Sequence, residues 1–215
     1  MFNGIKKALM FAAHTDDEMI CAGTLYRLVR SGVDVHMVAF SVAATKEDRK
    51  GMITSEKTVI PEWQESMKII GISETNREYI GFTPSSDLQR YKQDICQIAF
   101  DTVEELKPDL VITLSPEDEN TAHATVGVET ERVMRGRVPI VVRCIFPWNY
   151  GLGRPNLFIG LENVDLYAKR KVISAYQSQE FRYENGSMLL NQVIADGLSV
   201  KVPAAEKFEL VRGVL

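Results

Sequence analysis

Short apolar runs alternate along the chain with longer segments in which apolar residues recur at helical spacing. This alternation is typical of β-α-β units, where buried parallel strands are joined by helices that cover the sheet. The predicted strands span residues 7–13, 33–41, 77–82, 109–115, 140–146 and 157–161, with a short terminal strand at 208–211. The predicted helices span residues 17–31, 62–70, 88–106, 121–136, 164–176 and 187–196. The pattern therefore predicts an α/β protein with a mostly parallel sheet.

Two stretches follow neither period. Residues 42–59 are polar, charged and weakly periodic, which predicts a functional loop or a lid over a site. Residues 147–155 are rich in glycine and proline and predict a second such loop.

The composition is that of a globular protein. With 215 residues, 45% hydrophobic and 25% charged, the chain can close one core, so we expect a single domain over residues 1–215 with a Rossmann-like three-layer fold. A net charge of −4 disfavours binding to nucleic acid duplexes. No apolar run approaches the roughly 20 residues that span a bilayer, and no signal peptide is recognisable, so we expect a cytoplasmic protein.

Cysteine usage limits the kinds of metal site that are open to the chain. Cys21, Cys96 and Cys144 are odd in number, widely spaced and embedded in apolar segments. They predict buried thiols rather than disulfides or a thiolate zinc site. Any metal ligands are therefore expected to be nitrogen and oxygen atoms.

The most chemically suggestive segment is Ala-His-Thr-Asp-Asp-Glu at residues 13–18, directly after the first predicted strand. Thr15 and Glu18 fit a capping box for the helix that follows, in which the acidic first turn complements the helix dipole. Alternatively, His14 and Asp17 are ligands of a divalent metal, and Asp16 takes a proton from metal-bound water. The hexapeptide alone leaves both interpretations open.

The other histidines supply a candidate third ligand. His36 lies in the middle of the second predicted strand, where we expect a packed or partly exposed strand residue. His123 instead follows the strand at 109–115 through a polar loop, at the start of a predicted helix. Loops after parallel strands open at the same edge of a sheet, which can bring His14, Asp17 and His123 together. Two imidazoles, one carboxylate and an open position make a catalytic zinc set.

At this point the sequence resembles the LmbE-like, or PIG-L, family of zinc-dependent N-acetylglucosaminyl deacetylases. The first motif of that family reads Ala-His-Pro-Asp-Asp-Glu, and residues 13–18 match it except for Thr15. The second motif reads Ser-Pro, a few polar residues, His-Pro-Asp-His and a glycine four residues later. Residues 115–127 keep its Ser-Pro, its last histidine and its glycine. Ser178-Gln179 and the segment 204–209 are weaker echoes of the family's Ser-Gln and Ala-Glu-x-Phe segments.

The resemblance implies one zinc ion per chain held by His14, Asp17 and His123, with Asp16 as general base. It also implies hydrolysis of an N-acyl group, acetyl in the first instance, on an amino sugar or a related small-molecule conjugate. Relatives often form symmetric multimers, so a homo-oligomer is expected.

Two departures from the second motif qualify this expectation. Asn120 stands where the family has its first histidine, and Ala122 replaces the accompanying aspartate. We expect Asn120 to act in catalysis as a hydrogen-bond donor to an oxyanion, but asparagine carries no acidic proton near neutral pH. Loss of an acid catalyst typically costs 10²–10⁴-fold in rate. Asp16 alone, or Asp118 or Glu119, would have to compensate.

Substrate-binding positions also differ. Val59 aligns with an arginine that contributes to sugar or phosphate binding in relatives; Lys46, Arg49, Lys50 or Lys57 could substitute, although loop charges are most often only solvated.

Two aromatic residues of the loop at 147–155 have two open interpretations. Trp148 and Tyr150 could stack on a sugar ring, or they could pack the loop or a subunit interface.

Two other functions remain open. The chain could be a catalytically impaired relative that still binds metal or ligand. A binding module without metal is disfavoured, because no Gly-x-Gly-x-x-Gly follows the first strand.

Overall fold

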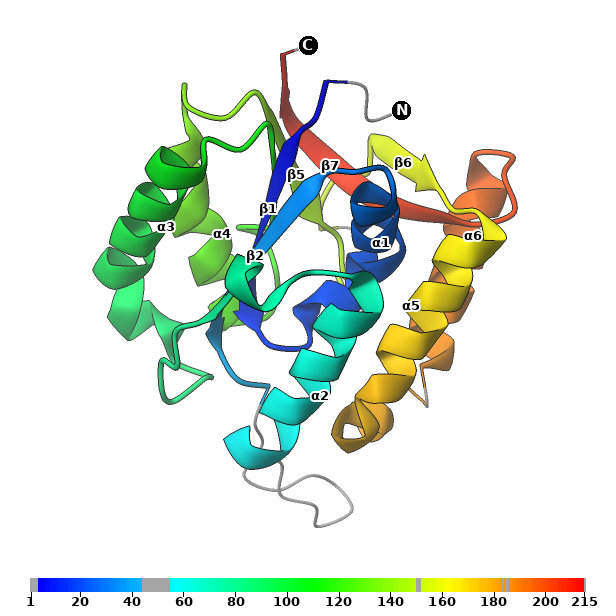
Figure 1. Ribbon diagram of the computed structural model, residues 1–215, viewed down its shortest axis with the longest axis horizontal. Coiled ribbons are helices and arrows are strands. Elements are labelled where there is room, and N and C mark those ends of the chain that lie inside the picture. The colour runs from blue at the N-terminus through cyan, green and yellow to red at the C-terminus, as the bar shows by residue number, and fades with distance from the viewer. Residues whose placement is uncertain (1–3, 44–54, 150–151, 183, 185, 215) are drawn as a thin grey trace.

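One seven-stranded sheet forms the centre of the molecule (Figure 1). The computed structural model describes residues 4–43, 55–149, 152–182, 184 and 186–214. The strands are β1 (Lys7–His14), β2 (Asp34–Ser41), β3 (Arg77–Tyr79), β4 (Leu110–Thr113), β5 (Ile140–Cys144), β6 (Leu157–Gly160) and β7 (Ala205–Gly213). Their order in the sheet is β3-β2-β1-β4-β5-β7-β6. The first five strands in this order pair in parallel, while β7 pairs antiparallel with both β5 and β6. The expected mostly parallel sheet is confirmed.

Helices cover both faces of the sheet and complete the three layers. The α-helices are α1 (Ala22–Arg30), α2 (Glu56–Ile70), α3 (Lys92–Leu106), α4 (Thr121–Met134), α5 (Asn163–Ala175) and α6 (Ser187–Ser199). The 3-10 helices are η1 (Asp17–Cys21), η2 (Glu74–Asn76), η3 (Leu88–Tyr91) and η4 (Gln177–Arg182). Helices α3 and α4 lie together on one side of the sheet, and α1, α2 and α5 pack together on the other (Figure 1). In the described part of the chain, no helix is long and apolar enough to cross a membrane.

The central strand β1 explains why the sheet is buried on both faces. Residues 8–13 are 0–1% exposed, and β1 pairs in parallel with β2 on one side and β4 on the other. Such a strand must be apolar at every position, as this run is. Because β1 and β4 are parallel neighbours, the segments that follow them leave the sheet at the same edge.

Helix α2 begins earlier than the sequence pattern predicts. It starts at Glu56 rather than at residue 62 and includes Pro61. Val59, Trp63 and Met67 form one buried face at four-residue spacing, and the exposed charged residues between them hid that face in the sequence. The helix ends as predicted, with Gly71 in the left-handed region at φ 92°.

Other boundaries differ for identifiable reasons. The predicted helix at 17–31 starts with the 3-10 turns of η1 and becomes α-helical only at Ala22. Strand β3 is shorter than predicted, since it is an edge strand that pairs only with β2. Strand β7 is longer than the predicted 208–211, because it pairs along its length with β5 and β6 and its first residues include the buried charge of Glu206.

Several expectations concern residues 44–54 or 150–151, which lie outside the described residues. They include most of the expected lid at 42–59, together with Lys46, Arg49, Lys50 and Tyr150. The end of that expected lid is wrong, because residues 56–59 form the first turn of α2. Lys57 is described and lies exposed in the first turn of α2.

The three cysteines are free thiols, as expected. Cys21 and Cys144 are buried, whereas Cys96 is only half-buried and packs against the edge of the core.

Candidate metal centre

The first motif forms a tight turn at the end of β1. His14 is the last residue of β1, and its backbone N–H donates to Asp17 Oδ2 at 2.9 Å. This bond folds the chain back so that the Asp17 carboxylate lies beside the His14 ring. Asp17 is 2% exposed, so water does not screen these contacts.

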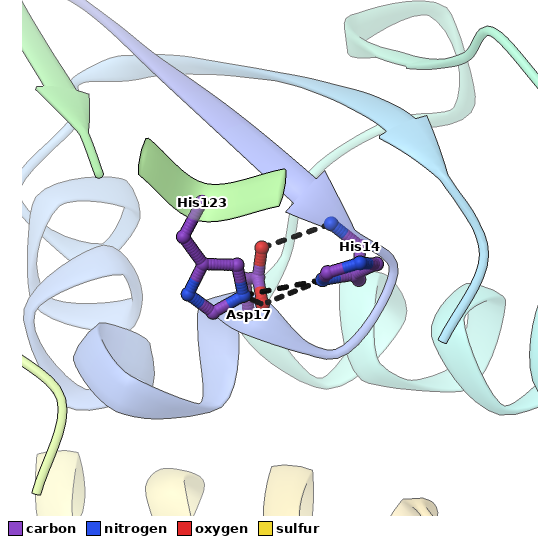
Figure 2. A group of neighbouring side chains, drawn as sticks. All are labelled: His14, Asp17 and His123. Carbon is purple, nitrogen blue, oxygen red and sulfur yellow. Dashed lines mark hydrogen bonds and ion pairs between the residues drawn. The ribbon is translucent and has the colours of Figure 1, made fainter. Parts of the chain in front are cut away.

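His123 reaches the same point from the neighbouring strand exit. It lies in the first turn of α4, after β4, and is 2% exposed. Its Nε2 is 3.1 Å from His14 Nδ1 and 3.1 Å from Asp17 Oδ1, and His14 Nδ1 is 3.7 Å from Asp17 Oδ1. Figure 2 shows the three side chains converging from β1, η1 and α4. The convergence expected from the parallel sheet is therefore observed.

These spacings fit a metal ion. Bonds of about 2.0–2.1 Å in a tetrahedral site place ligand atoms roughly 3.3–3.4 Å apart. The observed separations of 3.1, 3.1 and 3.7 Å bracket that value. The set contains two nitrogens and one oxygen, as expected from the absence of a thiolate motif, and leaves a fourth tetrahedral position for water or substrate.

Hydrogen bonds on the far side of each ring orient the histidines. His14 Nε2 lies 3.3 Å from the Ser85 carbonyl oxygen, and His123 Nδ1 lies 3.0 Å from Asp118 Oδ2. Both partners accept, so the proton of each neutral ring is placed on that outer nitrogen. The inner nitrogens, which face Asp17, then offer lone pairs to a metal. Such outer carboxylate and carbonyl partners are usual around metal-binding histidines.

The electrostatics of the cluster favour a cation. Burial alone would raise the pKa of Asp17, but the His123 and His14 rings hold it well below its usual range. Burial alone would lower the pKa of His123, but the Asp17 and Asp118 carboxylates raise it to about 10. The Asp17 and Asp118 carboxylates on either side of His123 therefore stabilise positive charge in the cluster, whether it is a proton or a metal ion.

Asp16 stands beside this cluster with different electrostatics. It is 3% exposed, and burial together with the Asp17 charge raises its pKa. The Arg182 guanidinium opposes this rise, with Nη1 3.9 Å from Asp16 Oδ2. A carboxylate with a raised pKa is better matched to taking up and releasing a proton than an exposed one.

A cavity of about 450 Å³ opens over the cluster. His14, Asp16, Asp17 and His123 line its floor, and its wall includes Glu119, Asn120, Trp148 and Arg182. The cavity is large enough for a sugar-sized group, and it lies where open α/β sheets bind their ligands.

Asn120 has a structural partner in this wall. Its Oδ1 accepts the Ala122 N–H at 3.0 Å, which caps α4 just before the first turn that contains His123. The backbone N–H of Asn120 donates to Asp118 Oδ1 at 2.8 Å. Since Oδ1 is committed to the cap, the carboxamide N–H₂ is the group available to the cavity.

The capping box proposed for Thr15 and Glu18 is wrong. Thr15 Oγ1 accepts the Ala43 N–H at 3.4 Å, and Glu18 Oε1 accepts a hydrogen bond from Ser66 Oγ at 2.5 Å. Glu18 also contacts the Tyr176 hydroxyl. The box fails because the α-helix starts only at Ala22, so the capping geometry does not arise at residue 15.

The buried surroundings of Glu18 favour its neutral form. The Tyr176 hydroxyl is placed against both the Thr15 carbonyl oxygen and Glu18 Oε1, but it carries a single proton. The two oxygens therefore share one donor. Burial, opposed by the hydrogen bonds from Ser66 and Tyr176, raises the pKa of Glu18 to about 8.

His36 and Trp148 can also be placed in the structure. His36 is a partly exposed strand residue, as expected, and its Nε2 lies 3.0 Å from Asp34 Oδ2. Trp148 stacks on Phe146 with ring centroids 4.6 Å apart, and its Nε1 donates to Asp118 Oδ1 at 3.4 Å. Trp148 therefore packs the wall of the site, and part of it also lines the cavity.

Sequence reasoning missed three contributors. Asp118 was considered only as a substitute acid, although its place five residues before His123 could have suggested a role in orienting that ring. The Ser85 carbonyl and Arg182 carry no motif, so only the folded chain brings them to the site.

Comparison with known proteins agrees with this geometry. The model of the PIG-L family, GlcNAc-PI de-N-acetylase, matches residues 9–134, which include both motifs. No curated protein sequence shows significant similarity to the chain.

Solved structures with the same fold include enzymes of different chemistry. The 4-carboxy-2-hydroxymuconate hydratase GalB from Pseudomonas putida is 20% identical with a TM-score of 0.81, and the match covers 98% of each chain. The N,N'-diacetylchitobiose deacetylase from Pyrococcus horikoshii is 18% identical with a TM-score of 0.67, covering 99% of this chain and 86% of that one. A zinc-inhibited form of the teicoplanin deacetylase Orf2 is 13% identical with a TM-score of 0.74, covering 95% and 97%.

The family model spans more than half of the sequence, and both of its motifs meet in one cluster of the described structure. The chain therefore belongs to the PIG-L family of de-N-acetylases.

Proposed function

We propose that the protein is a zinc-dependent amidohydrolase that removes an N-acyl group, acetyl in the first instance, from an amino sugar or a related small-molecule conjugate. The observation that carries the proposal is the convergence of ligand atoms from His14, Asp17 and His123 beside a buried Asp16. Zinc at this cluster would supply a nucleophilic water near neutral pH and a Lewis acid for the acyl oxygen.

Asp16 is the proposed general base. Its carboxylate takes a proton from the attacking water and can return that proton to the leaving amine nitrogen. The raised pKa of Asp16 favours this second step, because a more basic carboxylate keeps the proton until the leaving amine accepts it. Arg182 keeps the resting carboxylate charged and ready to accept the proton.

Asn120 is the proposed partner of the developing oxyanion. Asn120 lines the cavity, and its Oδ1 accepts the Ala122 N–H, which leaves the N–H₂ group as the donor for substrate. A fixed donor stabilises charge that appears only in the transition state. It cannot replace the acid that the family's histidine would provide.

The alternative is a catalytically impaired relative that still binds metal. It is favoured by Asn120 and Ala122, and by Asp118, whose carboxylate already accepts from His123, Asn120 and Trp148. Asp118 is therefore occupied as a hydrogen-bond acceptor and is not placed to act as a substitute acid. The fold does not decide the reaction, because a hydratase shares it. The choice between the two functions therefore depends on the residues of the site.

The test combines metal analysis with acetate release. We expect about one zinc per chain and chelator-sensitive release of acetate from N-acetylglucosamine derivatives. Because one structural neighbour is described as zinc-inhibited, turnover is measured with zinc both equimolar to the chain and in excess.

Variants assign the base. Asp16→Asn should lower kcat by about 10²–10⁴-fold while the zinc content is retained. The control Asp34→Asn removes a carboxylate that pairs with His36 outside the cavity and should leave kcat unchanged. Zinc binding without turnover on a broad panel of N-acyl substrates would favour the impaired relative. Chains without zinc would overturn both.

A further inference from the structure

A fully buried ion pair lies behind the metal-binding turn. Lys169, in α5, is 0% exposed, and Glu206, in β7, is 2% exposed. Lys169 Nζ lies 2.7 Å from Glu206 Oε1. Both residues lie outside the region matched by the family model and outside the residues that line the cavity.

Among the described residues, the other hydrogen bonds of this pair go to the backbone of η1 and α1, the segment that begins with Asp17. Lys169 Nζ donates to the carbonyl oxygens of Met19 at 2.7 Å and Ile20 at 2.8 Å, near the end of η1. The Gly23 and Thr24 N–H groups, at the start of α1, donate to Glu206 Oε1 at 3.0 Å and Oε2 at 2.7 Å. The pair therefore satisfies backbone groups on both sides of the break between η1 and α1.

That break lies close to Asp17 in the chain. The chain leaves the 3-10 helix at Cys21 with φ −123° and ψ 21°, which is outside the α-helical region, and resumes as α1 at Ala22. A break in the middle of a buried helical segment leaves N–H and carbonyl groups without helical partners. Asp17 opens η1, only two residues before the first carbonyl that Lys169 holds. Gly23 leaves room for the Glu206 carboxylate, since a Cβ there would lie 3.2 Å from Oε1 and 2.8 Å from Leu161 Cδ1.

The bonding pattern separates two explanations of the pair. The three N–H bonds of the ammonium group are all used, so Lys169 has no donor left for substrate or proton transfer. A buried ion pair is weak evidence for stability, because well-packed apolar residues often stabilise as much. The better explanation of the ion pair is therefore that it positions η1 and α1, to which its other hydrogen bonds go.

We propose that Lys169 and Glu206 are positioning residues that hold η1 against α1, so that the Asp17 carboxylate and its neighbour Asp16 stay in the geometry required for metal binding and catalysis. The proposal rests on the metal site of the proposed function. Glu206 lies in the segment that resembles the family's Ala-Glu-x-Phe segment, and the proposal assigns a physical role to this glutamate.

The test measures zinc affinity by competition with a chromophoric chelator. In Glu206→Gln one oxygen is replaced by an N–H₂ group, which cannot accept from the backbone and faces the Lys169 ammonium. We expect the zinc dissociation constant to rise by about 10–100-fold, the usual effect of losing a residue that supports metal ligands.

The matched control is Glu209→Gln, three residues further along β7. Glu209 pairs with Arg143 at 3.1 Å in a half-buried site away from η1. This variant loses an ion pair of the same strand that does not contact η1, so its zinc dissociation constant should stay within about twofold of the wild-type value.

Two further measurements keep the inference testable if Glu206→Gln does not fold. Glu206→Asp retains the charge that compensates Lys169 but withdraws the carboxylate from the Gly23 and Thr24 N–H groups, and we expect an intermediate loss of zinc affinity. In the wild type, linkage requires that zinc slow hydrogen exchange of the Gly23 and Thr24 amides.

The outcomes separate this inference from the metal site itself. Wild-type zinc binding that Glu206→Gln or Glu206→Asp leaves unchanged would overturn the positioning role alone, as would Gly23 and Thr24 exchange that is insensitive to zinc. Absence of zinc binding by the wild type would overturn the metal site and the inference together.

Discussion

At the scale of single residues, the site depends on which nitrogen of each histidine carries the proton. Asp118 and the Ser85 carbonyl hold the outer ring nitrogens, and this leaves the inner nitrogens of His14 and His123 directed at Asp17. The residue types of the cluster could be predicted from two short motifs. The hydrogen-bond partners that select the histidine tautomers could not be predicted in the same way. Ser85, for example, contributes only a backbone oxygen, and its position depends on the folded loop after β3.

Asp118 provides a direct test of this orientation. Asp118→Ala should weaken zinc binding by about 10–100-fold, because the His123 ring loses the acceptor that fixes its tautomer. The measurement is zinc affinity by chelator competition. The adjacent exposed carboxylate, changed in Glu117→Ala, serves as the control and should leave affinity unchanged. Equal affinity of Asp118→Ala and the wild type would contradict the role assigned to Asp118.

Glu18 predicts a pH-dependent effect on stability. Its folded-state pKa of about 8 lies above the ordinary glutamate pKa of 4.5, so between these values the folded chain binds a proton that the unfolded chain does not. The contribution of Glu18 to the free energy of unfolding therefore falls as pH rises from about 5 to about 8. Glu18→Gln cannot ionise, so its stability relative to the wild type should increase over this range. Urea unfolding of both chains measures the difference, and a difference that is independent of pH would refute the neutral state of Glu18.

At the scale of elements, the position of His123 is set by how closely α4 approaches the exit of β4. Gly127 lies one turn after His123, and a Cβ there would lie 2.6 Å from the Leu114 carbonyl oxygen and 2.8 Å from the backbone nitrogen of Pro116. Those are backbone atoms, which cannot move aside as a flexible side chain could. The spacing of a glycine four residues after the last histidine, visible in the sequence, thus has a steric cause.

Gly127→Ala should therefore push α4 away from the sheet. We expect a loss of about 1–3 kcal/mol in the free energy of unfolding, as for other overpacked sites, together with weaker zinc binding through displaced His123. Gly160→Ala in β6 is the control, because its Cβ would meet only Val202 Cγ2 at 3.8 Å. Urea melts and zinc titration of both variants test this, and an unperturbed Gly127→Ala would show that the approach of α4 is not limiting.

Element boundaries show where sequence patterns lose information. Strand β1 is apolar at every position from 8 to 13 and could be placed to within one residue. The first turns of α2 and the first residues of β7 could not, since exposed charges at Glu56 and Lys57, and the buried charge of Glu206, interrupt the apolar period. Glu206 is buried only because Lys169 compensates it, and no local pattern reveals a partner 37 residues away.

At the scale of the whole molecule, strand order creates the site. Strands β1 and β4 are far apart in the sequence but are parallel neighbours, so the segments after them deliver His14 and His123 to one edge of the sheet. This convergence follows from the rules for parallel sheets and could be predicted. The insertion of antiparallel β7 between β5 and β6 could not, because pairing partners of a terminal strand are not encoded in its own pattern.

Removal of the metal should lower the stability of the whole folded chain. A metal that binds only the folded chain stabilises it by about 2.7 kcal/mol when free zinc exceeds the dissociation constant a hundredfold. We therefore expect the melting temperature to fall on chelation and to recover with added zinc. The variant His123→Ala should melt at the same temperature with and without zinc. A wild-type melting temperature that does not respond to zinc would contradict a site built from separate strand exits.

The central claim, that His14, Asp17 and His123 hold one zinc ion, is tested most directly by zinc-edge X-ray absorption of the wild-type protein loaded with one equivalent of zinc. The account predicts scattering from two imidazole rings, with nitrogen and oxygen ligands at about 2.0–2.2 Å. A sulfur shell at about 2.3 Å, or a spectrum without imidazole scattering, would contradict it.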